Sequence, residues 1–463
     1  MDYLSLTYLF VLMTPLTVAA SQFPVQLSIS QEKKFFPHEI STYIQHVNVQ
    51  IKTGQSVQTH SKPPQELFLV LDTSGSMASG KKWTNAVLAI ESIIRNMNSE
   101  DKLHLIQYNS RSSIVFENEN DHRIMLNALH ALYPTGGTNL MTGFDQAITL
   151  VKKYSERLTL KRLFLFSDGH INEGVTQHTQ LLKEVTYMKT IYEITICSFG
   201  IGADFDEKLM TNIADHGSGD YFFIQGADSM KKVVDIAYKG FQSVMGTNAY
   251  LKITTKNDAH IVDVYGYELK NDENQIISIG DIRYDDMMNI LLQTEVKITE
   301  KLLEQSEIDY MIIELWMTDV VDRSSKLVTS KSVLFSFSKN EEELKDLNKV
   351  VARLVELQQI QRREKEVTKL LRAQRVQDAM KLKQKLAKEL EFTSKTLDEE
   401  SAFDGEDLTT FEYAKDQAHT MKRRSNDMVS SFSSGIMTDA ELAKQNEYYT
   451  KLSEKYKKAH HDL

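Results

Sequence analysis

The chain has 463 residues, of which 41% are hydrophobic and 25% charged, a composition typical of a globular protein with about two to four domains. Its one cysteine, Cys197, excludes an internal disulfide and every zinc module built from several cysteines. The formal net charge of −10 argues against a general nucleic-acid-binding surface, so no nucleic-acid partner is expected.

The N-terminal stretch has the pattern of a secretory signal. Residues 1–20 contain an uncharged apolar run and end in Val18-Ala19-Ala20, directly before Ser21. Small residues at this place are typical of a signal-peptidase site, and the run is too short to span a bilayer. The sequence therefore predicts a signal peptide, a secreted extracellular protein and no transmembrane span in the mature chain. The stretch has no basic residue, which keeps a cytoplasmic location as the alternative.

Two separate segments show the alternation of half-buried strands. In residues 21–63, the apolar residues Val47, Val49 and Ile51 alternate with polar ones, which predicts a strand with one solvated face. Residues 246–339 alternate in the same way and predict an antiparallel β region. We expect the two segments to pair in one β domain, with the intervening chain inserted between them.

The inserted segment, residues 64–245, alternates strands with helices. Continuous apolar runs at Glu66–Asp72 and Arg162–Phe166 are typical of strands buried on both faces of a parallel sheet. Helical periodicity separates these runs. The segment is therefore predicted to be an α/β domain with a Rossmann-like, doubly wound and mostly parallel sheet.

Residues 340–463 are predicted to form a helical C-terminal region. The chain has no Gly or Pro from Asn340 to Glu391, and Leu344, Leu347 and Val351 follow helical spacing, which indicates a helical hairpin. The remainder of this region, from residue 400 on, is polar and is expected to be partly helical with a mobile end. The long amphipathic helices leave three alternatives open: a solvated face, binding to an acidic surface, or self-association through residues 341–391.

Three short motifs carry oxygen ligands, two at the ends of predicted strands and one at the start of a predicted helix. Asp72, Ser74 and Ser76 follow the first buried strand, Thr138 precedes a helix in Gly-Gly-Thr-Asn, and Asp168 ends another buried strand in Ser-Asp-Gly. The carboxyl ends of parallel strands meet at one edge of the sheet, so all five side chains can converge there. Carboxylates and hydroxyls are hard ligands suited to Mg²⁺, and a set without His or Cys disfavours zinc and copper.

At this point the sequence resembles a known family. Asp-x-Ser-x-Ser, the Thr of Gly-Gly-Thr-Asn and the Asp of Ser-Asp-Gly are similar to the metal-ion-dependent adhesion site (MIDAS) of the von Willebrand factor type A (VWFA) domain, over residues 64–245. The resemblance implies that Ser74 and Ser76 bind the metal directly and Thr138 directly or through water. It implies that Asp72 and Asp168 act mainly through water, and that an Asp or Glu of a partner protein completes the coordination. The arrangement of domains more loosely resembles inter-alpha-trypsin inhibitor heavy chains.

Competing interpretations of these residues are weaker. Gly75–Lys81 partly matches a phosphate-binding loop, but Lys82 stands where that motif needs Ser or Thr to bind magnesium. Cys197 lies in a predicted buried strand, where a thiol is usually an inert core residue. Because no general base with a substrate pocket is evident, we expect the protein not to be an enzyme.

The sequence thus predicts a metal-dependent protein-interaction or adhesion module. Its metal would be Mg²⁺, with Mn²⁺ or Ca²⁺ as alternatives, held by the five residues above and completed by an acidic side chain of a partner. The alternative is a structural scaffold protein that assembles through its β and helical regions. In that case the metal would only stabilise the loops of the VWFA domain.

Overall fold

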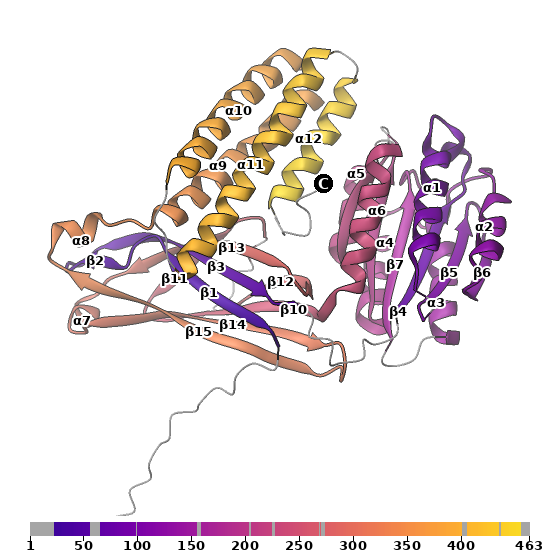
Figure 1. The fold of residues 1–463 in the computed structure, drawn as a ribbon. Helices are drawn as coiled ribbons and strands as arrows, with labels where there is room; N and C mark the ends of the chain where they lie inside the picture. Colours follow the sequence, from indigo (N-terminus) through magenta and orange to yellow (C-terminus); the bar gives the residue numbers. More distant parts are fainter. Residues whose placement is uncertain are drawn as a thin grey trace, which may run out of the picture.

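The computed structural model describes residues 23–55, 65–98, 100–154, 159–202, 205–224, 227–267, 269, 274–400, 405–434 and 437–454. The predicted signal peptide at residues 1–20 lies outside them. Among the described residues, no helix combines the length and the apolar character that crossing a membrane requires. Figure 1 shows an α/β domain at one end of the molecule, a β-sandwich at the other, and a helical bundle above the sandwich.

The α/β domain is built on one six-stranded sheet, and the predicted fold class is confirmed. The strand order is β6-β5-β4-β7-β8-β9, and every neighbouring pair is parallel except β5 and β6. The strands are β4 (Gln65–Asp72), β5 (Lys102–Tyr108), β6 (Ser112–Glu119), β7 (Leu160–Ser167), β8 (Ile194–Ile201) and β9 (Ser218–Ile224).

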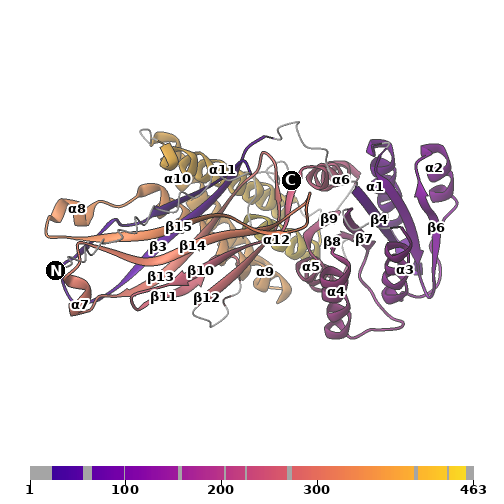
Figure 2. The same ribbon diagram turned by 90° about the horizontal axis from the view of Figure 1, so that it is seen from below.

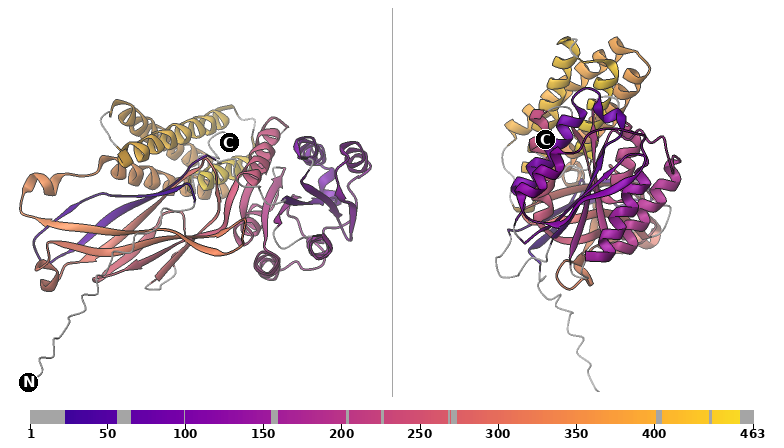
Figure 3. Two further views of the ribbon diagram at one scale, coloured as in Figure 1. Left: turned by 60° about the horizontal axis from the view of Figure 1, so that its bottom comes forward. Right: turned by 90° about the vertical axis from the view of Figure 1, so that its right-hand side faces the viewer.

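Helices cover both faces of this sheet, as the right-hand view of Figure 3 shows. One face packs against α1 (Lys82–Asn96), α2 (His122–His130) and α6 (Ala227–Gln242). The other packs against α3 (Leu140–Tyr154), α4 (His178–Tyr192) and α5 (Glu207–His216). With both faces covered, every residue of the central strand β4 is buried, which explains its continuous apolar sequence.

The β-sandwich joins the chain before the α/β domain to the chain after it. Strand β3 pairs antiparallel with β13, with Val49 opposite Ile290, so the α/β domain is inserted between β3 and β10. One sheet has the order β1-β3-β13-β11 and the other β12-β10-β14-β15-β2. The strands are β1 (Val25–Gln31), β2 (Phe35–Pro37), β3 (Thr42–Thr53), β10 (Val244–Thr255), β11 (Ala259–Val264), β12 (Asn274–Arg283), β13 (Met287–Lys297), β14 (Glu307–Asp319) and β15 (Ser325–Ser338), with the short helix α7 (Glu300–Leu303) before β14.

The prediction that β3 has a solvated face was wrong. Asn48 and Gln50, on the polar side of the strand, are 0% and 2% exposed. Gln50 Nε2 donates a hydrogen bond to Thr410 Oγ1 of α11 (Gly405–Ser434) at 3.3 Å, and Asn48 Nδ2 donates to Asn289 Oδ1 at 2.7 Å. The helical bundle lies over this sheet, so its polar face is buried and hydrogen-bonded.

The C-terminal region forms five helices in the described residues: α8 (Glu341–Lys345), α9 (Lys349–Arg372), α10 (Val376–Glu399), α11 and α12 (Asp439–Glu454). The expected helical run through Leu347 is interrupted, and this side chain is 40% exposed. Asn348 Oδ1 instead accepts hydrogen bonds from the amides of Val350 and Val351, at 3.0 and 3.1 Å, and begins α9 as its N-cap.

The apolar seam of the long helices is buried inside the bundle. Leu354 of α9, Leu386 and Leu390 of α10 and Met428 of α11 belong to one core cluster. Figure 2 shows this bundle lying along the sandwich and reaching the α/β domain. The apolar helix faces that suggested self-association are therefore packed against each other within the same chain. Association through residues 341–391 stays a prediction.

Buried ion pairs join the sandwich to the α/β domain. Arg162 of β7 pairs with Asp281 of β12, and Arg283 Nη2 lies 2.5 Å from Asp220 Oδ2 of β9. Arg162 and Arg283 are 2% and 5% exposed. Breaking either pair would leave an uncompensated buried charge, so separating the two parts at this contact would be destabilising.

The last helix, α12, joins the bundle to the α/β domain. Tyr448 packs edge-on against Phe223 of β9, with ring centroids 6.1 Å apart. Lys444 Nζ donates a hydrogen bond to the carbonyl oxygen of Phe205 at 2.9 Å and lies over the Phe205 ring. The described part of the region from residue 400 on is thus packed helix, where the sequence suggested a polar and only partly helical tail. The end of the chain that was expected to be mobile, residues 455–463, lies outside the described residues.

Candidate metal site

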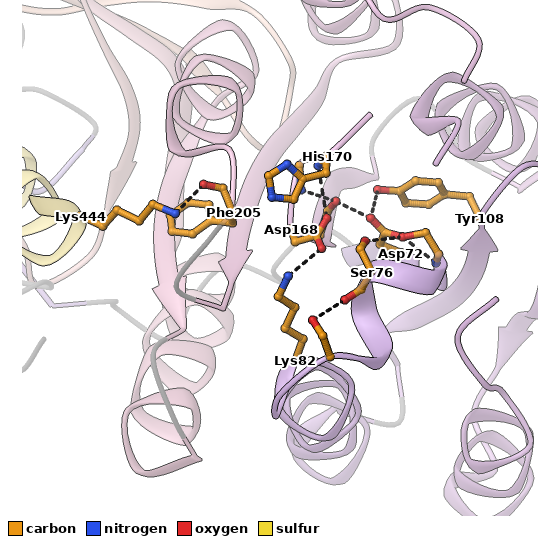
Figure 4. A network of polar contacts seen from close by, with 12 residues as sticks. Asp72, Ser76, Lys82, Tyr108, Asp168, His170, Phe205 and Lys444 are labelled. Atoms are coloured by element: carbon orange, nitrogen blue, oxygen red, sulfur yellow. Dashed lines mark hydrogen bonds and ion pairs between the residues drawn. The ribbon is translucent and has the colours of Figure 1, made fainter. Parts of the chain in front are cut away.

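The five predicted ligands come together at the carboxyl edge of the α/β sheet. Asp72 ends β4, Ser74 is the N-cap of the short 3₁₀ helix η1 (Gly75–Ala78), and Ser76 lies within that helix. Thr138 lies just before α3, and Asp168 follows β7 directly. Since β4 and β7 are adjacent parallel strands, their ends bring both carboxylates to one place, as Figure 4 shows for Asp72 and Asp168.

Backbone hydrogen bonds tie the serine loop to the threonine loop. The amide of Gly75 donates to the carbonyl of Gly136 at 3.0 Å, and the amide of Thr135 donates to the carbonyl of Thr73 at 2.7 Å. These two bonds set the distance between the loops without any side chain. The loops are therefore preorganised around the site before a ligand arrives.

The loop after β7 holds Thr138 from the other side. The amide of Thr138 donates to Asn172 Oδ1 at 2.8 Å, and the amide of Glu173 donates to the carbonyl of Thr138 at 3.1 Å. Thr138 is 1% exposed. The Glu173 carboxylate lies directly over Gly137, so a side chain at this position would displace it.

Asp72 is fully buried and oriented by hydrogen bonds. Its Oδ1 accepts from the amide of Ser74 at 2.9 Å, and its Oδ2 accepts from Ser167 Oγ at 2.6 Å and from the Tyr108 hydroxyl at 3.2 Å. Burial raises the pKa of Asp72, while the hydrogen bonds from Ser167 and Ser74 oppose the shift. A cation beside this carboxylate would favour its charged form.

The two serine hydroxyls have the spacing of neighbouring metal ligands. Ser74 Oγ and Ser76 Oγ are hydrogen-bonded to each other at 3.1 Å. Adjacent oxygens of an octahedron with metal–oxygen bonds of about 2.1 Å are about 3.0 Å apart. In the part of the chain that the structure describes, no group of three or more His, Cys, Asp or Glu side chains could hold a metal. The hydroxyl-rich site thus fits a hard divalent cation in both spacing and chemistry.

Three residues of the site were missed by the sequence analysis. Tyr108 and Ser167 orient Asp72, and Lys82 Nζ lies 3.0 Å from Asp168 Oδ2. The position of Ser167 directly before Asp168 was the available signal for one of them. Lys82 is the first residue of α1. Nothing in its local sequence shows that its ammonium reaches Asp168, which follows β7.

Two other residues, Cys197 and His170, lie outside the set of ligands. Cys197 in β8 is 1% exposed, and burial raises the pKa of its thiol to about 11, so the thiol is protonated and inaccessible at neutral pH. His170 is exposed at the rim, and its backbone amide donates to Asp168 Oδ1 at 3.2 Å. Figure 4 shows its ring beside Asp168.

Comparison with known proteins identifies the class of the α/β domain. The family model of the von Willebrand factor type A domain matches residues 67–170, which include all five candidate ligands. The chain therefore contains a VWFA domain, and this part of the predicted resemblance is confirmed.

Relatives of known sequence or structure resemble the chain distantly. The uncharacterized protein YfbK of Escherichia coli is 26% identical over 176 residues, which cover 37% of this chain and 30% of that protein. A von Willebrand factor type A protein from Catenulispora acidiphila shares the fold with a TM-score of 0.61 at 15% identity, covering 80% of this chain and 88% of that one. The ArnB paralog VWA2 from Sulfolobus acidocaldarius has a TM-score of 0.55 at 13% identity, covering 92% and 98%.

The structural likenesses show the fold, and the family-model match shows the domain class. The chain spans less than half the length of the curated relatives that it matches first. The resemblance to inter-alpha-trypsin inhibitor heavy chains stays a prediction.

Proposed function

We propose that the protein is a metal-dependent interaction module rather than an enzyme. Ser74, Ser76 and Thr138 would hold Mg²⁺, with Mn²⁺ or Ca²⁺ as alternatives, and Asp72 and Asp168 would balance its charge. The bound ion would supply an electrophilic position for an Asp or Glu side chain of a partner protein. The observation that carries the proposal is the 3.1 Å spacing of the Ser74 and Ser76 hydroxyls beside the buried carboxylate of Asp72.

The arrangement of the loops supports a contact that depends on the ion. Asp72, Ser74, Thr138 and Asp168 are at most 1% exposed, while Ser76 is partly exposed. The protein's own carboxylates therefore lie behind the hydroxyls and cannot reach a partner directly. A metal held at the hydroxyls would link the buried negative charges to an acidic group outside, and removing the metal would leave the Asp72 carboxylate facing that acidic group without a cation between them.

The test compares the metal site with a matched serine in the same loop. Ser74→Ala removes a proposed ligand, whereas Ser79→Ala removes an exposed hydroxyl that donates to the Ser76 carbonyl. Calorimetric titration of the full chain should detect Mg²⁺ or Mn²⁺ binding in the wild type and in Ser79→Ala, and at least tenfold weaker binding in Ser74→Ala. Equal affinities in all three proteins would contradict the assigned site.

A partner-capture experiment then distinguishes the two proposed functions, a metal-dependent interaction module and a structural scaffold. A partner retained in Mg²⁺ by the wild type and Ser79→Ala, but lost in EDTA and with Ser74→Ala, supports binding through the ion. Partners retained equally in every condition place the binding surface in the sandwich or the bundle, and the metal would then only stabilise loops. Secretion is a separate proposal, and a mature N-terminus at Ser21 of the exported protein would support it.

A further inference from the structure

A lysine of the same chain contacts one of the two carboxylates of the metal site. Lys82 Nζ lies 3.0 Å from Asp168 Oδ2, and the two side chains are 6% and 0% exposed. Figure 4 shows Lys82 reaching from the start of α1 toward Asp168. An ammonium and a carboxylate at this distance, both removed from water, form a charge-assisted hydrogen bond.

A glycine leaves the space through which the Lys82 side chain reaches Asp168. Gly202, in the loop after β8, has a φ of +88°, and a Cβ there would lie 2.6 Å from Lys82 Cε and 2.9 Å from Lys82 Cγ. Any side chain at this position would displace the lysine from its path. The preceding residue, Lys81, is exposed, so only the second of two adjacent lysines is directed into the site.

The charges around the site explain what this lysine does to a metal. Asp72 and Asp168 carry two negative charges that would attract a divalent cation, and both carboxylates are fully buried. The Lys82 ammonium already neutralises one of them and would repel a second cation in the same low-dielectric surroundings. In the metal-free protein, the same contact keeps Asp168 from being a buried charge without a counter-ion.

We propose that Lys82 is a tethered counter-ion that competes with the divalent metal for Asp168 and thereby lowers the metal affinity of the site. This inference rests on the proposed metal-binding function. The metal binds only when its concentration is high enough to displace the lysine from Asp168, and the partner binds only when the metal is bound. Below that metal concentration, Lys82 keeps Asp168 paired.

The first test compares the two adjacent lysines. Lys82→Met and Lys81→Met change the net charge equally and differ only in whether the lost ammonium contacts Asp168. Mg²⁺ and Mn²⁺ dissociation constants of the full chain are measured by calorimetry. A hydrogen bond to a charged group changes equilibria by roughly ten- to a hundredfold, so Lys82→Met should bind the metal about tenfold more tightly or better. Lys81→Met should stay within about twofold of the wild type, because an exposed charge is screened by water and salt.

A second variant guards against a loss of folding. Lys82→Gln keeps a neutral hydrogen-bond donor on a side chain that is one bond shorter, and circular dichroism of each variant reports whether the fold is retained. The glutamine variant should also bind the metal more tightly than the wild type. In EDTA, both Lys82 variants should melt at a lower temperature than the wild type, and Mg²⁺ should raise their melting temperature by more than it raises that of the wild type.

The outcomes distinguish this inference from the function on which it rests. Metal binding that is unchanged or weaker in both folded Lys82 variants overturns the inference and leaves the metal site intact. Binding by the variants but not by the wild type supports it in its strongest form. If neither the wild type nor any variant binds Mg²⁺ or Mn²⁺, both the metal site and the role of Lys82 are refuted.

Discussion

The buried ion pair at the centre of the helical bundle offers the sharpest test of how the C-terminal region is held together. Lys383 Nζ of α10 lies 2.7 Å from Glu364 Oε2 of α9 and donates to Asn446 Oδ1 of α12 at 2.9 Å. Lys383 and Glu364 are 3% and 5% exposed. Burial lowers the pKa of Lys383, although Glu364 opposes the shift. One ammonium thus connects three helices.

Lys383→Met should destabilise the bundle by about 3–5 kcal/mol, because it leaves the Glu364 carboxylate buried without a counter-ion. The matched control is Lys385→Met on the exposed side of the same helix, which should cost less than about 0.5 kcal/mol. The double variant Glu364→Gln with Lys383→Met removes both charges and should recover most of the loss, since a buried pair contributes little net stability over neutral residues.

Native-state hydrogen exchange is the suitable assay, because a chain with several domains does not unfold in one step. The opening free energies of amides in α9, α10 and α12 report the loss directly, while amides of β4 in the α/β sheet serve as an internal reference. The reasoning is refuted if Lys383→Met lowers the opening free energies no more than Lys385→Met does. It is refuted equally if the double variant is less stable than Lys383→Met alone.

Three further results are expected. Mg²⁺ at about one hundred times its dissociation constant should stabilise the wild-type α/β domain by about 2.7 kcal/mol and Ser74→Ala much less, which thermal melts with and without EDTA would reveal. Cys197, with a pKa of about 11 and 1% exposure, should resist alkylation at pH 8 until denaturant unfolds β8, and mass spectrometry at rising urea would contradict this if labelling preceded unfolding. Tyr448→Ala removes a buried ring from the contact with Phe223 and should raise hydrogen exchange in α12, whereas unchanged exchange would mean that this contact does not hold the helix.

Local sequence determined the α/β domain and indicated where its candidate site lies. The run Glu66–Asp72 predicted a strand buried on both faces because every residue of such a strand contacts apolar neighbours, and all of β4 is buried. Ser74 and Ser76 were predictable as a pair because their spacing lies within a single short loop. The convergence of Asp72 and Asp168 followed from the rule that parallel strands end at one edge of a sheet, and Thr138 lies at the start of a helix beside that edge.

Only the tertiary structure decided which polar residues are buried and what they contact. Asn48 and Gln50 have the sequence pattern of a solvated face, but the bundle covers them. Lys82 stands beside the exposed Lys81 with nothing local to distinguish them, and its partner Asp168 lies 86 residues away. Periodicity reports the neighbours that a residue has within one element, whereas the burial of a polar side chain depends on segments distant in the sequence that the fold brings against it.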